Sequence, residues 1–269
     1  MLLLIEPKRP NSTRMRNPNW SEEELILAFN LYCKIPFGKI SKSNPQIIQL
    51  SGLIGRTPSA LGLKLSNLAS FDPSLKARGI KGMKNAGKND RLIFEKFQND
   101  REGLIFHSER ILAEYEGLSL EKKYEKELPE MSGLVGETKE RYVKTRVNQN
   151  FFRQMILTNY HSKCAVTGID LPQLLIASHI LPWAENKAER LNPENGICLS
   201  ALYDKAFDQH LISFDEDYRM ILSKNLKEYC TKDYYQNHFG KLEGREIFLP
   251  DRGLPNDLFL KAHNSKCYL

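Results

Sequence analysis

The feature that most constrains the fold is a pattern of two short strands followed by a helix in the carboxy-terminal half of the chain. Residues 171–179 form a largely apolar run, and a second run, Gly-Ile-Cys-Leu-Ser, occupies residues 196–200. A helix is expected over 201–210, and the apolar residues 211–214 read as a closing strand. The order strand, loop, strand, helix predicts a small α+β unit in this part of the chain.

This unit carries polar side chains that are suited to chemistry. His179 ends the first strand, Asn195 precedes the second, and the helix holds Asp204 and Asp208. Residues four apart lie on one helix face, so both carboxylates can point at one spot, where they repel unless a cation lies between them. Taken singly, the aspartates suit a solvated helix face and the histidine suits a hydrogen-bonded core position. The joint pattern is more specific than either part.

The joint pattern resembles the HNH nuclease family, whose catalytic element is a ββα-metal fold, and in particular its branch of bacterial restriction-type endonucleases. The resemblance covers about residues 141–220. The tail from Ile247 to His263 looks like the usual ending of that branch. The segments around Trp20 and Ile54 look like those that often precede such nuclease domains. The matching strings are Cys164-Ala-Val-Thr-Gly, Ala177-Ser-His-Ile-Leu-Pro-Trp, Arg190-Leu-Asn-Pro-Glu-Asn-Gly-Ile-Cys-Leu-Ser and Asp204-Lys-Ala-Phe-Asp-Gln-His-Leu-Ile-Ser-Phe.

The resemblance implies a role for each polar residue. His179 matches the general base, Asn195 matches the asparagine that braces the loop holding it, and Asp204 and Asp208 match metal-ligand positions. Ser178 stands where many members carry an Asp or His ligand, so the metal shell is expected to be completed by water and phosphate. Carboxylate ligands favour Mg²⁺, with Mn²⁺ as a substitute.

A structural zinc is not expected from the resemblance. The positions of the family's two CxxC pairs look like Cys164, Thr167, Ser200 and Tyr203, which hold only one thiol. His210 lies two residues past Asp208, off the face of the two aspartates, and is not counted as a site residue.

The amino-terminal third is basic, which indicates a polyanion as partner or else a solvated face. Residues 1–91 hold 15 Lys/Arg against six Asp/Glu, although the net charge of the whole chain is only +6. Ser21 and three following glutamates predict a helix over 22–32. Residues 45–65 read as two helices joined at Gly55-Arg56, which fits either a helix-turn-helix or an ordinary helical hairpin.

In the helix-turn-helix interpretation, Arg56, Ser59 and Lys64 contact DNA. A following glycine-containing basic stretch would neutralise phosphates and make binding depend strongly on salt. Arg146 and Arg153 add cations next to the strand–helix unit. The expected DNA-binding residues are Arg56, Ser59, Lys64, Lys76, Arg78, Lys81, Lys84, Arg146 and Arg153.

These observations predict an α+β chain in four parts. They are a flexible basic arm (1–18), a mostly helical DNA-recognition domain (19–107), a charged linker (108–140) and an HNH nuclease domain with flanking helices (141–269). The scattered cysteines oppose a disulfide framework, and no apolar run is long enough for a membrane span, so we expect a soluble cytoplasmic protein.

The expected function is cleavage of double-stranded DNA by a metal-dependent endonuclease of the restriction or defence type, acting as a homodimer. A DNA-binding regulator with a decayed nuclease element is the alternative, motivated by Ser178. An RNA-processing enzyme is disfavoured, because the sequence holds no aromatic RNA-binding string.

Overall fold

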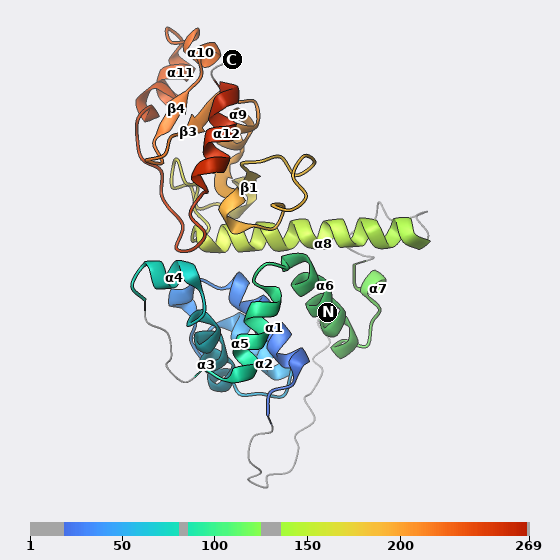
Figure 1. Ribbon diagram of the computed structural model, residues 1–269. Coiled ribbons are helices and arrows are strands. Elements are labelled where there is room, and N and C mark those ends of the chain that lie inside the picture. Colours follow the sequence, from blue (N-terminus) through green and yellow to red (C-terminus); the bar gives the residue numbers. More distant parts are fainter. Residues whose placement is uncertain (1–18, 81–85, 125–135, 268–269) are drawn as a thin grey trace.

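The computed structural model describes residues 19–80, 86–124 and 136–267, and it confirms an α+β architecture. Helices α1 to α7 form one half of the molecule, and the four strands found in these described residues lie in the other half (Figure 1). The long helix α8 (Gly136–Asn159) runs between the two halves and packs against both.

The amino-terminal half is a cluster of helices that begin at recognisable caps. Ser21 and Glu24 form a capping box at the start of the first helix, as the sequence predicts. Thr57 caps the second helix of the predicted pair, with Pro58 in its first turn. The helices are α1 (Glu22–Lys34), α2 (Pro45–Leu53), α3 (Pro58–Ala69), α4 (Pro73–Ala77), α5 (Lys88–Phe97), α6 (Arg101–Tyr115) and α7 (Leu120–Tyr124).

The segment expected as a charged linker, 108–140, is in part packed helix. Ile111 and Ala113 are buried on α6, and Tyr124 of α7 donates a hydrogen bond of 2.8 Å to the buried carboxylate of Glu109. Burying one glutamate between a tyrosine and nearby lysines lets a Glu- and Lys-rich sequence form part of a core. That arrangement was not visible in the apolar pattern. Residues 125–135 of the expected linker lie outside the described residues, as does the arm 1–18.

The carboxy-terminal half contains two antiparallel hairpins that carry helices. In the first hairpin β1 pairs with β2, and Leu175 lies opposite Ser200 while His179 lies opposite Gly196. In the second, β3 pairs with β4. The elements are β1 (Leu175–His179), β2 (Gly196–Ser200), α9 (Ala201–Asp208), β3 (Ile212–Phe214), β4 (Met220–Leu222), α10 (Lys224–Lys227), α11 (Asp233–His238) and α12 (Asp257–Cys267).

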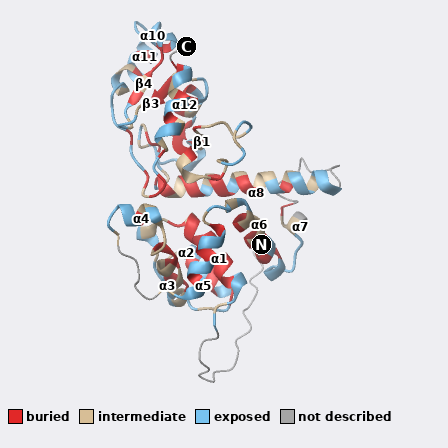
Figure 2. Ribbon diagram, viewed as in Figure 1, coloured by how far each residue is buried: buried red, intermediate tan, exposed pale blue. Residues whose placement is uncertain are grey.

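Buried residues continue through both halves and along α8 (Figure 2). The Phe151 ring lies 5.3 Å from the Lys34 ammonium of α1, whereas Phe152 packs on the first hairpin. The guanidinium of Arg252, which is buried, donates to the backbone carbonyls of Tyr32 and Ile35. The carboxy-terminal half is therefore fastened directly to α1.

None of the helices in the described part of the chain has the length and apolar character that a bilayer crossing requires.

Candidate active site

The site is built around His179, at the end of β1. Its ring stacks on Phe152 of α8, with 3.8 Å between the ring centroids and 13° between the planes. Gly196 lies opposite His179, and a Cβ at Gly196 would come within 2.7 Å of Phe152 and 2.5 Å of Ile156. The glycine therefore makes room for the phenylalanine that supports the histidine ring.

Hydrogen bonding fixes which nitrogen of His179 is basic. Nε2 lies 2.9 Å from the backbone carbonyl oxygen of Arg190. A carbonyl only accepts, so Nε2 carries the proton in the neutral ring and Nδ1 offers a lone pair. Burial lowers the pKa of His179, and the Arg190 carbonyl and the charge of Asp208 oppose that shift. The imidazole is therefore neutral at neutral pH and able to accept a proton at Nδ1.

Asn195 holds together the loop that links the two strands. Its side chain is completely buried; Oδ1 accepts from the Leu181 amide at 2.8 Å, and Nδ2 donates to the carbonyls of Leu181 and Glu189. Three backbone groups of the loop are thereby bound to one side chain. Glu189 precedes Arg190, so this bracing also positions the carbonyl that binds His179 Nε2.

The two carboxylates of α9 lie close enough to influence each other, and that of Asp208 also acts on the histidine. Asp204 is half-buried; burial raises its pKa, the Ser178 hydroxyl lowers it and the charge of Asp208 raises it. Asp208 is exposed, and its charge also acts on His179. Within the described ranges, no lysine or arginine forms an ion pair with either aspartate.

These residues fit a divalent cation. The Ser178 hydroxyl is buried and makes no hydrogen bond of normal geometry with any described residue, although it is near enough to Asp204 to affect its pKa. A buried hydroxyl near the half-buried Asp204, whose carboxylate is also repelled by that of Asp208, is the environment that a hard cation and its water would relieve.

Comparison with protein families identifies this segment. Residues 164–215 match the family model described as HNH endonuclease. This segment is an HNH endonuclease domain. The match begins in the turn before β1 and ends just after β3, so it contains both strands of the first hairpin and α9. No curated protein matches the chain.

An HNH endonuclease domain at residues 164–215 implies metal-dependent nuclease chemistry with a divalent cation and DNA as substrate. The HNH domain contains Ser178, His179, Asn195, Asp204 and Asp208, all five residues expected at the centre of the site. Their individual roles stay predictions.

Arg190 is a residue whose importance the sequence pattern did not reveal. Its carbonyl accepts from His179, its Nε donates to the Trp183 carbonyl at 2.6 Å, and its guanidinium lies 5.0 Å from the Trp183 ring. The Trp183 ring in turn contacts His179 edge-on. Any residue can accept a hydrogen bond through its backbone carbonyl, so the sequence does not reveal this role of Arg190. Only the presence of a tryptophan and an arginine in one loop could have indicated that they contact each other beside the histidine.

The cations expected in the helix-turn-helix are engaged within the helical half. Arg56 forms two hydrogen bonds of 2.7 Å with Glu24 and lies over the Trp20 ring. Lys64 forms an ion pair of 2.7 Å with Asp90, which is buried. Both cations therefore stabilise the helical cluster. Such ion pairs are as compatible with an ordinary helical hairpin as with a helix-turn-helix. Contact with DNA by either residue stays a prediction.

The remaining expected DNA contacts have different surroundings. Ser59 and Lys76 are exposed, whereas Arg78 forms an ion pair and a short hydrogen bond with Asp251. Arg153 donates to the Leu175 and Pro172 carbonyls and so supports the start of β1, and Arg146 bonds to the Tyr142 hydroxyl. Lys81 and Lys84 lie outside the described residues.

Proposed function

We propose that this protein is a Mg²⁺-dependent DNA endonuclease in which His179 is the general base and Asp204, Asp208 and Ser178 surround the metal. The observation that carries the proposal is the fixed proton arrangement of His179. Its Nε2 is committed to a carbonyl at 2.9 Å, which leaves Nδ1 as the base, and the charge of Asp208 acts on the same ring.

The reaction is hydrolysis of a phosphodiester. His179 Nδ1 accepts a proton from a water molecule as that water attacks phosphorus, and the Phe152 ring and the Arg190 carbonyl keep the imidazole oriented. Asn195 keeps the loop that supplies the Arg190 carbonyl in place. A divalent cation, when bound, supplies Lewis-acid stabilisation of the charge on the phosphate and the leaving oxygen.

We further infer that the enzyme serves restriction or defence and that the amino-terminal half chooses the site. The chemical centre recognises a phosphodiester and has no means to read bases. The basic residues of the amino-terminal third, of which Lys76 and Lys88 are exposed, supply charge for a DNA backbone. Digesting modified and unmodified genomic DNA and sequencing the fragment ends would distinguish sequence-specific restriction from general nuclease activity.

The alternative function is a DNA-binding regulator with a decayed nuclease element. Ser178 favours it, because a hydroxyl is a poor metal ligand. The oriented His179, the bracing by Asn195 and the unpaired carboxylates of Asp204 and Asp208 oppose it. A decayed site has no reason to retain an uncompensated half-buried carboxylate.

We expect the purified protein to convert supercoiled plasmid to nicked and linear forms with Mg²⁺ or Mn²⁺, and to lose this activity in EDTA. The cation is needed to offset charge at the phosphate. Gel analysis of time courses measures both products. The metal-free reaction and the His179→Ala protein, purified in the same way, control for contaminating nucleases. Binding of DNA without any cleavage would favour the regulator.

We propose that the protein acts as a homodimer on DNA, because the expected reaction cuts both strands. One site hydrolyses one bond per engagement, and duplex DNA has a local two-fold axis that a C₂ dimer matches. The aromatic segment 229–239 is a candidate for the contact between the two subunits, but only part of it is exposed. Tyr229 and Tyr234 are exposed and adjacent, whereas Tyr235 and Phe239 belong to the core. Analytical ultracentrifugation should show two chains per duplex; one chain per duplex would contradict the dimer.

A further inference from the structure

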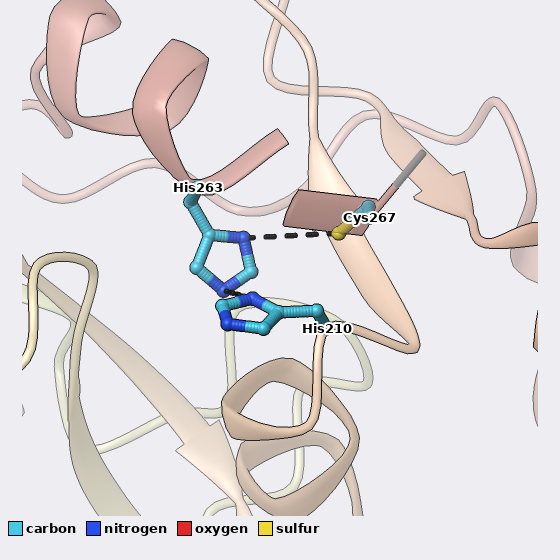
Figure 3. Close-up of side chains that lie close together, drawn as sticks. All are labelled: His210, His263 and Cys267. Carbon is cyan, nitrogen blue, oxygen red and sulfur yellow. Dashed lines mark hydrogen bonds between the residues drawn. The ribbon is translucent and has the colours of Figure 1, made fainter. Parts of the chain in front are cut away.

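A second group of metal-binding side chains lies where α12 packs on β3 and the end of α9. His210 follows α9, and His263 and Cys267 lie one turn apart on α12, so the latter two share a face (Figure 3). One ligand atom from each residue lies within 4.8 Å of the other two. Within the described residues, this is the group of three or more His, Cys, Asp or Glu side chains that converges most clearly on one point.

The two histidines already stand at the spacing of ligands to one ion. His210 Nδ1 lies 3.1 Å from His263 Nε2. Zinc binds imidazole nitrogens at about 2.0–2.1 Å, so two such ligands in a tetrahedral shell are about 3.3 Å apart. The spacing of the two nitrogens therefore suits a shared zinc ion.

The other nitrogen of His263 has the partner that a zinc-bound imidazole needs. Ser213 Oγ lies 2.8 Å from His263 Nδ1 and is buried, so it can accept the Nδ1 proton when Nε2 binds the ion. The His263 ring also stacks on Phe207, with 3.8 Å between centroids and 4° between planes. Both contacts fix the ring in the orientation that directs Nε2 at His210.

Cys267 would supply the third ligand after a rotation of its side chain. Its sulfur lies 4.0 Å from His263 Nδ1 and donates a weak hydrogen bond of 3.6 Å to the Ile212 carbonyl. Turning the sulfur toward the two nitrogens sacrifices only these two weak sulfur contacts. Metal binding would release the thiol proton to solvent and form the zinc–thiolate bond, with no change in oxidation state.

The metal-free arrangement leaves the His263 Nε2 proton between two acceptors. Nε2 lies 3.1 Å from the Phe207 carbonyl and 3.1 Å from His210 Nδ1. His210 is partly exposed and has a backbone φ of +52°, in the left-handed region that few residues other than glycine adopt.

We propose that His210, His263 and Cys267 form a zinc site that fastens α12 to the HNH domain and is separate from the Asp204 site. Two imidazoles and a thiolate suit Zn²⁺, whereas the oxygen ligands of the Asp204 site suit Mg²⁺. A pocket of about 260 Å³, lined by His210 and His263 together with Glu185 and Lys266, leaves the fourth position open to water. The resemblance predicts no structural zinc, because its CxxC positions hold only one thiol; the proposed site uses none of those positions and departs from that expectation.

Titration of the full-length protein with Co²⁺, a spectroscopic substitute for Zn²⁺, tests the proposal. We expect a thiolate-to-cobalt charge-transfer band that saturates at one equivalent and disappears on addition of Zn²⁺. Cys267→Ser should abolish the band, and His210→Asn, which keeps a residue tolerant of positive φ, should weaken binding at least about ten-fold. Zn²⁺ should raise the melting temperature of the wild type and not that of Cys267→Ser.

Two matched variants separate this site from other sources of the signal. Cys230→Ser removes the exposed cysteine, and Asp204→Asn alters the proposed catalytic metal site; both should retain the band at full intensity. Retention of the band in Cys267→Ser would overturn the proposal, as would its loss in Cys230→Ser. Absence of any thiolate band in the folded wild type would show that the three side chains form only a hydrogen-bonded network.

Discussion

His179→Ala is expected to reduce DNA cleavage by roughly 10²–10⁴-fold, the usual contribution of a general base. The change removes Nδ1, the nitrogen that the Arg190 carbonyl leaves free to accept a proton. DNA affinity should change little, because the base acts on water. Single-turnover cleavage rates and DNA binding in Ca²⁺, measured on the same preparations, separate the two effects.

His238→Ala is a matched control, because His238 is exposed and its known contact, acceptance of the Tyr203 hydroxyl, uses the backbone carbonyl. This variant should cleave like the wild type. His179→Ala also loses the stacking on Phe152 and should lower stability, so the melting temperature of each variant is measured as well. A folded His179→Ala protein that cleaves within about threefold of wild type would remove His179 from the role of base.

Local patterns predicted the first hairpin and α9 well, because their determinants are close in sequence. The apolar runs ending at His179 and Ser200 fall on β1 and β2, and the expected helix from Ala201 is α9. That helix ends at Asp208 and not at His210, because His210 adopts positive φ and turns the chain into β3. The residue-level pattern could not show this turn, since histidine is not a usual helix terminator.

The parts that the sequence could not predict depend on partners far along the chain. Arg56 and Lys64 look like free cations in sequence, but Glu24 and Asp90, 32 and 26 residues away, bind them. Burial of Arg252 against the Tyr32 carbonyl joins residues 220 positions apart. Charge counting treats all such side chains as surface groups, and it therefore overestimates the charge available for DNA.

The zinc proposal illustrates the same limitation. His263 and Cys267 have the i, i+4 spacing of two ligands on a helix, which is visible in sequence. His210 joins them only because β3 packs beside α12, and no spacing rule predicts that contact. The proposal also gives His210 a purpose away from the catalytic face, which agrees with its position two residues beyond Asp208.

Asp204→Asn is expected to reduce metal affinity and cleavage together, with cleavage falling at least about 100-fold. Removing a residue that only supports a metal ligand already lowers metal affinity or activity by about 10–100-fold, and a direct ligand should matter more. The amide keeps the shape of the side chain and removes the half-buried charge that faces Ser178. Asp208→Asn should have a smaller effect because Asp208 is exposed. Calorimetric titration with Mn²⁺ and cleavage rates at saturating Mn²⁺ measure the two quantities.

Asn195→Ala provides the contrast that distinguishes a ligand from a bracing residue. It should slow cleavage and lower the melting temperature, because three buried backbone groups lose their hydrogen-bond partner. Each loss lowers the free energy of unfolding by at most about 1–3 kcal/mol. The affinity for Mn²⁺ should stay largely unchanged. In EDTA, Asp204→Asn should instead melt at a temperature equal to or above that of the wild type, because it relieves repulsion with Asp208. A variant that is inactive and at least as stable identifies a residue kept for function, whereas unchanged Mn²⁺ affinity in Asp204→Asn would exclude Asp204 from the metal shell.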